Sequence, residues 1–335
     1  MSRRRPARLL ELSGEASLTR RALRFAHARG PLRTSPLEQL KHRVAVGSLI
    51  SFVLCAPVEA ARMLVLQAGD TPRLATVVST LRERVGMTVD VVQLADLTEE
   101  GWQSALVHGE KPSVIVALGP RASDFVFVRR IAAPTVHCLA GPDALRAGVP
   151  ALPSDVPADL QASWLRRLVP NAKVIGFAFD PLVNARRVEA IAAGFGAAGY
   201  RTFMSPVTTP AALPQALNEI AARADVLFAL PDATVYTRES ARGLLLQSFR
   251  TRTPLIGPND AWVRMGALYS LDWDYVEVGA ACAALALREV QPSRGAPPPL
   301  PPPLRPRVSV NTKSASQFDL RWPAELLRAV DRRHE

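Results

Sequence analysis

Polar side chains gather where the apolar runs of this sequence end. Asp232, Thr234 and Tyr236 fall within the stretch LPDATVYTRES, which follows one apolar run, and Asp260 and Trp262 follow the next. Backbone amides at helix starts favour a carboxylate, a buried aspartate can pair with an ammonium, and an aromatic ring can cover an apolar group. Plain helix capping uses many of the same residue types. Together, the residues support the binding of an amino acid or a related zwitterion.

Other apolar runs end in the same way. The further predicted ligand-binding positions are Gly69, Asp70, Gly119, Arg121, Asp180 and Asn184. In open α/β sheets, ligands bind at the carboxyl ends of the strands. We therefore expect these side chains to border one cleft.

The sequence offers no constellation for catalysis. It contains no G-x-S-x-G elbow, Walker A loop or H-E-x-x-H helix. The stretch GFGAAG at 194–199 fits a dinucleotide-binding pattern, but it lies at the end of an expected helix rather than after a strand. Five scattered histidines show no metal-ligand spacing, and three cysteines do not indicate a disulfide framework. We predict a binding protein that is not an enzyme, with no catalytic residues, metal or cofactor.

The elements that position these residues follow from the alternation of short apolar runs with amphipathic stretches, which is typical of βαβ units. In the first series we expect strands at 63–69, 89–94, 113–119 and 134–141, with helices between Thr71 and Gly86 and near 97–108 and 121–131. In the second we expect helices at 157–168, 183–197, 210–223, 235–251 and 275–290, and strands at 173–180, 200–207, 225–230, 254–257 and 267–273. The expected fold class is α/β, with two Rossmann-like doubly wound lobes and a ligand cleft between them.

The predicted domain boundaries follow from this pattern. Residues 1–60 form a basic leader and signal peptide, residues 61–150 form the N-terminal lobe, and residues 151–291 form the C-terminal lobe. A C-terminal segment is a candidate to complete the N-terminal lobe. Residues 292–335 form a proline-rich segment and a tail, in which RVSVN indicates a strand and FDLRWPAELLRAVDRR a helix. An extended surface connection explains the proline-rich segment better than a polyproline recognition site.

The net charge of +11 belongs mostly to the leader. Residues 1–43 hold eleven basic and three acidic side chains, and the rest shows no basic stripe interleaved with aromatics, so we predict no nucleic-acid partner. The apolar run Val44–Leu54 follows Lys41-His42-Arg43 and precedes a small-x-small motif, which predicts export to the periplasm with cleavage after Ala60. The residues before Cys55 do not form a lipobox, so we do not predict a lipoprotein. A true translation start near Leu37 or Val44 would explain residues 1–36.

Three segments carry a resemblance to a known family. LVPNAKVIGFAFDP at 168–181, the long stretch 230–279 and the tail VSVNTKSASQFDL are similar to ABC transporter substrate-binding proteins of the group that includes the tryptophan- and tyrosine-binding periplasmic proteins. The resemblance covers most of residues 63–330. It implies a type 1 periplasmic-binding fold. It also implies that Asp232 and Thr234 match a ligand-contacting loop, and that Gly119 to Ala122 match a strand-end turn in the first lobe.

These observations predict the exported solute-binding component of an ABC uptake system, a monomer that binds a small-molecule solute such as an amino acid and delivers it to an inner-membrane permease. Three alternatives remain. The same fold could serve as a periplasmic sensor or partner-binding module, as an enzyme, or as the core of a DNA-binding regulator. The last would need an N-terminal helix-turn-helix, where the run Val44–Leu54 stands instead.

Overall fold

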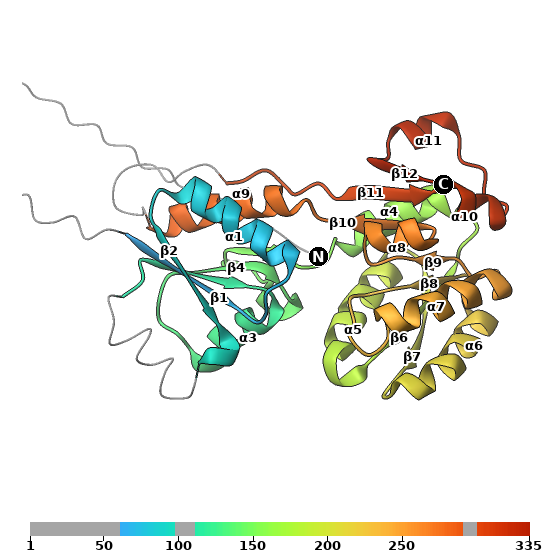
Figure 1. Ribbon diagram of the computed structural model, residues 1–335, viewed down its shortest axis with the longest axis horizontal. Helices are drawn as coiled ribbons and strands as arrows, with labels where there is room; N and C mark the ends of the chain where they lie inside the picture. Colours follow the sequence, from blue (N-terminus) through green and yellow to red (C-terminus); the bar gives the residue numbers. More distant parts are fainter. Residues whose placement is uncertain (1–60, 98–110, 291–299) are drawn as a thin grey trace, which may run out of the picture. The chain divides into compact units, whose positions relative to one another are not determined.

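Two β-sheets organise the residues that the computed structural model describes, which are 61–97, 111–290 and 300–335 (Figure 1). The signal segment, most of the helix expected near 97–108 and the start of the proline-rich stretch lie outside these residues. The first sheet is wholly parallel, in the order β2-β1-β3-β4-β5. Its strands are β1 (Arg62–Gln67), β2 (Thr88–Gln93), β3 (Val114–Leu118), β4 (Thr135–Ala140) and β5 (Ala151–Pro153).

Both faces of the first sheet are covered by helices. Met63 and Val65 of β1 pack in the hydrophobic cluster that includes α1 (Pro72–Val85) and α9 (Tyr275–Val290). The alternate residues, Leu64 and Leu66, pack instead in the cluster that includes α3 (Pro120–Arg129). Burial on both faces explains why the strand is a continuous apolar run rather than an alternating one.

Helix α1 begins and ends where its sequence signals predict. The side chain of Thr71 accepts a hydrogen bond from the backbone N–H of Leu74 at 3.4 Å, and Pro72 occupies the first turn, where its missing N–H costs nothing. Gly86 ends the helix in the left-handed conformation, with φ of 61°.

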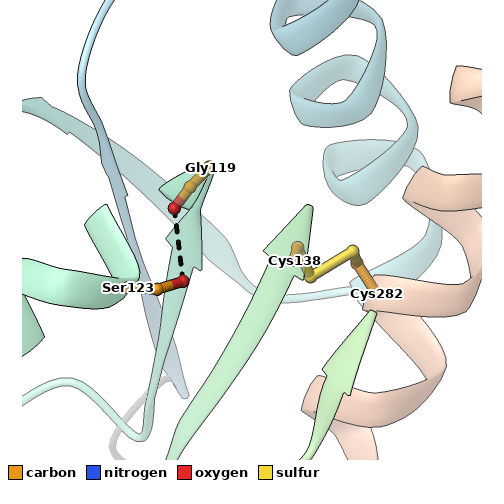
Figure 2. The surroundings of a disulfide bond; sticks show 4 residues. All are labelled: Gly119, Ser123, Cys138 and Cys282. Carbon is orange, nitrogen blue, oxygen red and sulfur yellow. Dashed lines mark hydrogen bonds between the residues drawn. A yellow bond between two sulfur atoms is a disulfide. The ribbon is translucent and has the colours of Figure 1, made fainter. Parts of the chain in front are cut away.

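Helix α9 follows β10 of the second sheet but packs on the first. It lies along α1 (Figure 1), so closely that a Cβ added to Gly279 would fall 2.6 Å from Cβ of Thr80. A disulfide joins Cys282 of this helix to Cys138 of β4 (Figure 2). The absence of a disulfide framework was therefore a wrong prediction, because the two cysteines are 144 residues apart and only the tertiary fold brings them together.

The second sheet has the order β12-β11-β10-β9-β8-β6-β7. Its strands are β6 (Val174–Phe179), β7 (Arg201–Pro206), β8 (Val226–Phe228), β9 (Leu255–Ile256), β10 (Tyr269–Asp272), β11 (Arg307–Asn311) and β12 (Arg332–His334). All neighbours are parallel except β10 and β11, which are antiparallel. Its helices are α4 (Ala158–Leu168), α5 (Pro181–Ala197), α6 (Leu213–Arg223), α7 (Arg238–Thr251), α8 (Asp260–Met265), α10 (Thr312–Gln317) and α11 (Ala324–Arg328).

Several elements differ from the sequence-based expectation. Strand β5 pairs with β4, and α9 packs on the first sheet, so the first lobe includes residues that the predicted boundaries assigned to 151–291. The C-terminal helix is only five residues long and is followed by β12, an added parallel strand beside β11. Short helices and strands of this kind carry too little periodicity to be recognised from sequence alone.

Candidate functional site

A cavity of about 490 Å³ borders the first turns of two helices, one from each sheet. Helix α3 follows β3 and α5 follows β6, so both first turns lie at the carboxyl ends of parallel strands. At the start of α3, Gly119 has φ of 96°, which favours glycine, and its carbonyl accepts a hydrogen bond from the hydroxyl of Ser123 at 3.2 Å (Figure 2). We call this cavity the outer compartment. It is lined by Pro120, Arg121, Asp124, Gly141, Pro142, Asp143, Ser154, Pro181, Leu182, Val183, Asn184, Ala185, Arg186, Arg187 and Pro231.

The outer compartment combines charge with exposed apolar surface. Arg186 pairs with Asp143 at 2.8 Å. Burial raises the pKa of Asp124, the negative charge of Asp143 raises it further, and Arg186 acts against both. Leu182 and Val183 are 90% and 69% exposed although both are large and apolar. Such residues at the mouth of a cavity offer contact surface to an apolar group.

Asp232 holds the start of α5 in place. Its Oδ2 accepts hydrogen bonds from the backbone N–H of Asp180 and from the side-chain amide of Asn184, each at 2.8 Å. Its Oδ1 accepts from the backbone N–H groups of Thr234 and Val235 at 2.9 and 3.0 Å. The buried carboxylate therefore joins the ends of β6 and β8 through four hydrogen bonds.

A smaller chamber of about 50 Å³ adjoins the outer compartment, since Ser154, Arg187 and Pro231 line both. We call it the inner chamber. Its walls include Asp155 and Gln161 from the chain segment that leads from the first sheet to the second. Leu271, Asp272, Trp273 and Tyr275 come from the segment that leads back to the first. Residues on these two crossings therefore line this space.

Two ion pairs line the inner chamber. Arg187 donates from Nε to Oδ2 of Asp155 at 2.7 Å, and its Nη2 contacts Oδ1 of the same carboxylate. Arg73 lies 3.4 Å from Oδ2 of Asp272 and donates to the hydroxyl of Tyr275, which itself donates to Asp272 at 2.8 Å. Burial raises the pKa of Asp272, and the positive charge of Arg73 acts against that rise.

The structure brings only some of the predicted ligand-binding residues together. Arg121 and Asn184 line the outer compartment, and Asp180 caps α5 beside it. Thr234 donates from its hydroxyl to Asp180 at 2.7 Å and borders a separate groove between α6 and α7. Gly69 and Asp70 follow β1, and Gly119 precedes α3.

The remaining four predicted residues lie elsewhere. Ala122 is buried in the core of the first lobe. Tyr236 and Trp262 pack edge to face in the core of the second lobe, with ring centroids 5.9 Å apart. Asp260 accepts from Arg332 and contacts His334 beside β12.

Sequence reasoning missed the residues that line the inner chamber. Asp155, Gln161 and Arg187 follow no predicted strand end, since Asp155 lies after the unrecognised strand β5, Gln161 lies within α4 and Arg187 lies in the second turn of α5. Trp273 is the last residue of the predicted strand 267–273, but it was not proposed as a binding residue. The available signal was topological, since Asp155 and Trp273 lie where the chain passes from one lobe to the other. Among the described residues, no group of three or more His, Cys, Asp or Glu side chains could hold a metal ion. No helix in the described ranges is long and apolar enough to cross a membrane.

Comparison with known proteins agrees with this architecture. Residues 106–333 match the family model of the ABC transporter substrate binding protein. An ABC domain from Streptococcus pneumoniae, solved in complex with L-Trp, is 16% identical, with a TM-score of 0.60 over 82% of this chain and 99% of that one. A ligand-free, open substrate-binding protein with adhesive properties from Clostridium difficile is 17% identical, with a TM-score of 0.61 over 82% and 100%. A conserved domain protein from Vibrio cholerae is 20% identical, with a TM-score of 0.58 over 82% and 100%. No curated protein matches the sequence.

The two parallel-rich sheets and the similarity to these solved structures show a type 1 periplasmic-binding fold. The chain belongs to the family of ABC transporter substrate-binding proteins. Membership implies a small-molecule ligand and a transporter partner, and the family is in general non-enzymatic.

Proposed function

We propose that this protein is the exported solute-binding component of an ABC-type uptake transporter, and that it binds an amino acid, with aromatic amino acids among the candidates. The observation that carries the proposal is the pair of adjoining cavities at the carboxyl ends of the strands. Their lining provides cationic and anionic side chains for a zwitterion and exposed apolar side chains for the rest of a solute. The L-Trp bound to the Streptococcus pneumoniae neighbour makes tryptophan the first candidate to test.

The disulfide supports export. Disulfides form and persist in oxidising compartments such as the bacterial periplasm and are rare in the reducing cytosol. Cys138 and Cys282 are both fully buried, so their bond belongs to the core of the first lobe. A periplasmic location places the protein where a solute can be passed to a permease in the inner membrane.

A thermal-shift panel of amino acids, nucleosides, sugars and short-chain acids tests the proposal. A solute present at 100 times its dissociation constant stabilises the folded state by about 2.7 kcal/mol, which raises Tm measurably. We expect one class of solute, the amino acids, to produce this rise. A panel in which no solute shifts Tm would contradict solute capture and favour the partner-binding alternative. Chemical turnover of a stabilising solute would favour an enzyme.

A further inference from the structure

Two buried polar atoms without a hydrogen-bond partner belong to residues that line the inner chamber. They are Oε1 of Gln161, an acceptor, and Nε1 of Trp273, a donor, in residues that are 7% and 4% exposed. Native proteins leave few buried polar atoms unpaired, because each lost hydrogen bond costs free energy. An unpaired acceptor and an unpaired donor beside one chamber indicate a guest that carries both a donor and an acceptor.

The ion pair between Arg187 and Asp155 presents opposite charges to the same space. The two side chains are only 19% and 23% exposed, so the charges lie in a partly desolvated setting where ionic interactions are stronger than in water. Arg187 also donates to the carbonyl of Pro231 at 3.2 Å, which fixes the guanidinium independently of Asp155. The guanidinium can therefore keep its place while its anionic partner changes.

The two cavities differ in volume, so each holds a different part of a bound solute. About 50 Å³ accommodates one small polar group, whereas about 490 Å³ accommodates the body of a small molecule. Arg187 lines both cavities, and the exposed side chains of Leu182 and Val183 line only the outer compartment. A solute with a charged end and an apolar body fits this division.

We propose that an amino acid binds by opening the ion pair between Arg187 and Asp155. Its carboxylate takes the place of Asp155 on the guanidinium, and its ammonium takes the place of Arg187 on the carboxylate. Trp273 donates from Nε1 to the bound carboxylate, and Gln161 accepts from the bound ammonium. The amino-acid side chain extends into the outer compartment and covers Leu182 and Val183. This assignment rests on the proposed solute-binding function and adds the residues that select the solute.

Charge balance explains why the arrangement selects a zwitterion. An amino acid gives each half of the opened pair a new partner, so no buried charge remains uncompensated. A simple carboxylic acid would pair with Arg187 but leave the charge of Asp155 without a partner. An amine would pair with Asp155 but leave the charge of Arg187 without one. Removing one partner of a desolvated ion pair is strongly unfavourable. A neutral sugar offers no charge to replace either member.

The test uses titration calorimetry of the purified full chain with L-tryptophan, L-tyrosine and L-leucine, each compared with its carboxamide and its N-acetyl form. We expect at least one free amino acid to bind, and both of its modified forms to bind at least about a hundredfold more weakly, because each leaves one charge of the pair unmatched. Arg187→Met and Asp155→Asn are each expected to weaken binding of the free amino acid by at least about a hundredfold for the same reason.

Arg252→Met and Asp319→Asn are matched controls, since these residues form an exposed Arg–Asp pair in the second lobe away from both cavities. Both should bind the amino acid as the unaltered protein does. The unliganded Tm of each variant shows whether it folds, and the comparison of free and modified amino acids needs no variant at all.

The outcomes separate the two levels of the proposal. Equal affinity for an amino acid and its carboxamide, or unchanged affinity in Arg187→Met, would overturn the ion-pair assignment. Binding of a sugar or nucleoside in place of every amino acid would also overturn it while leaving solute capture intact. Failure to bind any solute would overturn both.

Discussion

Breaking the disulfide between Cys138 and Cys282 should destabilise the protein strongly, because the bond closes a long loop. The cysteines are 144 residues apart. The loop-closure entropy removed from the unfolded chain by a cross-link of that span corresponds to about 5 kcal/mol at 25 °C. The link ties α9 to β4 and so holds the returning segment against the first sheet (Figure 2).

The expected change in Tm follows from the size of the folded body. At about 2.1 cal/mol/K per residue, the unfolding entropy of the roughly 280 residues after Pro57 is about 0.6 kcal/mol/K. A loss of about 5 kcal/mol therefore lowers Tm by roughly 9 °C. The reduced wild type is the best test, because it removes the bond but keeps both sulfur atoms and creates no cavity. Cys138→Ala with Cys282→Ala provides a second comparison that needs no reductant.

The assay is thermal unfolding followed by circular dichroism, with and without a phosphine reductant. Alkylation and mass spectrometry must show that both thiols are free in the reduced sample. A fall of less than about 3 °C in a sample with both thiols free would refute the reasoning, since the loop-closure entropy would then not stabilise the fold. A mass spectrum of the exported protein without the disulfide would refute the pairing itself.

Three further perturbations test other parts of the structure. Asp232→Ala removes four hydrogen bonds at the ends of β6 and β8 and should lower the free energy of unfolding by at least about 3 kcal/mol. Urea titration measures this value, and an unchanged free energy would show that other groups hold these loops. Gly279→Ala places a Cβ 2.6 Å from Thr80 and should cost about 1–3 kcal/mol by overpacking α1 against α9, whereas Gly243→Ala, with nothing within 4 Å of its added Cβ, is the control. Burial raises the pKa of Asp272 in the folded state, so this carboxyl binds its proton more tightly there than in the unfolded chain. The stability of the wild type relative to Asp272→Asn should therefore rise as the pH falls from 7 toward about 4, and a pH-independent difference would contradict the shift.

The sequence alone determined the fold class and most of the elements. Continuous apolar runs such as that of β1 predicted strands buried on both faces, and Thr71 and Gly86 predicted the ends of α1. These signals are local: each depends on residues within a few positions of one another, so they can be read without knowledge of the rest of the chain.

The site depended on what the tertiary structure brings together. Asp232 was predicted to bind ligand because it follows a strand. Its carboxylate instead accepts hydrogen bonds within the second lobe, from backbone and side-chain donors that lie up to 52 residues away. Tyr236 and Trp262 follow strand ends but turn into the core, where they contact each other. A strand-end position therefore indicates the right edge of a sheet without fixing the direction of the side chain.

The disulfide and the inner chamber were decided by tertiary structure alone. Both depend on segments that pass from one sheet to the other. Helix α9 follows the second sheet and brings Cys282 to Cys138 on the first, and the segment that leads from β5 to the second sheet brings Asp155 to Arg187. Sequence spacing carries no information about such pairs, because their separations of 144 and 32 residues are set by the path of the chain rather than by a local repeat. Local physics thus specified the strands and helices, and long-range packing selected which side chains meet in the cleft.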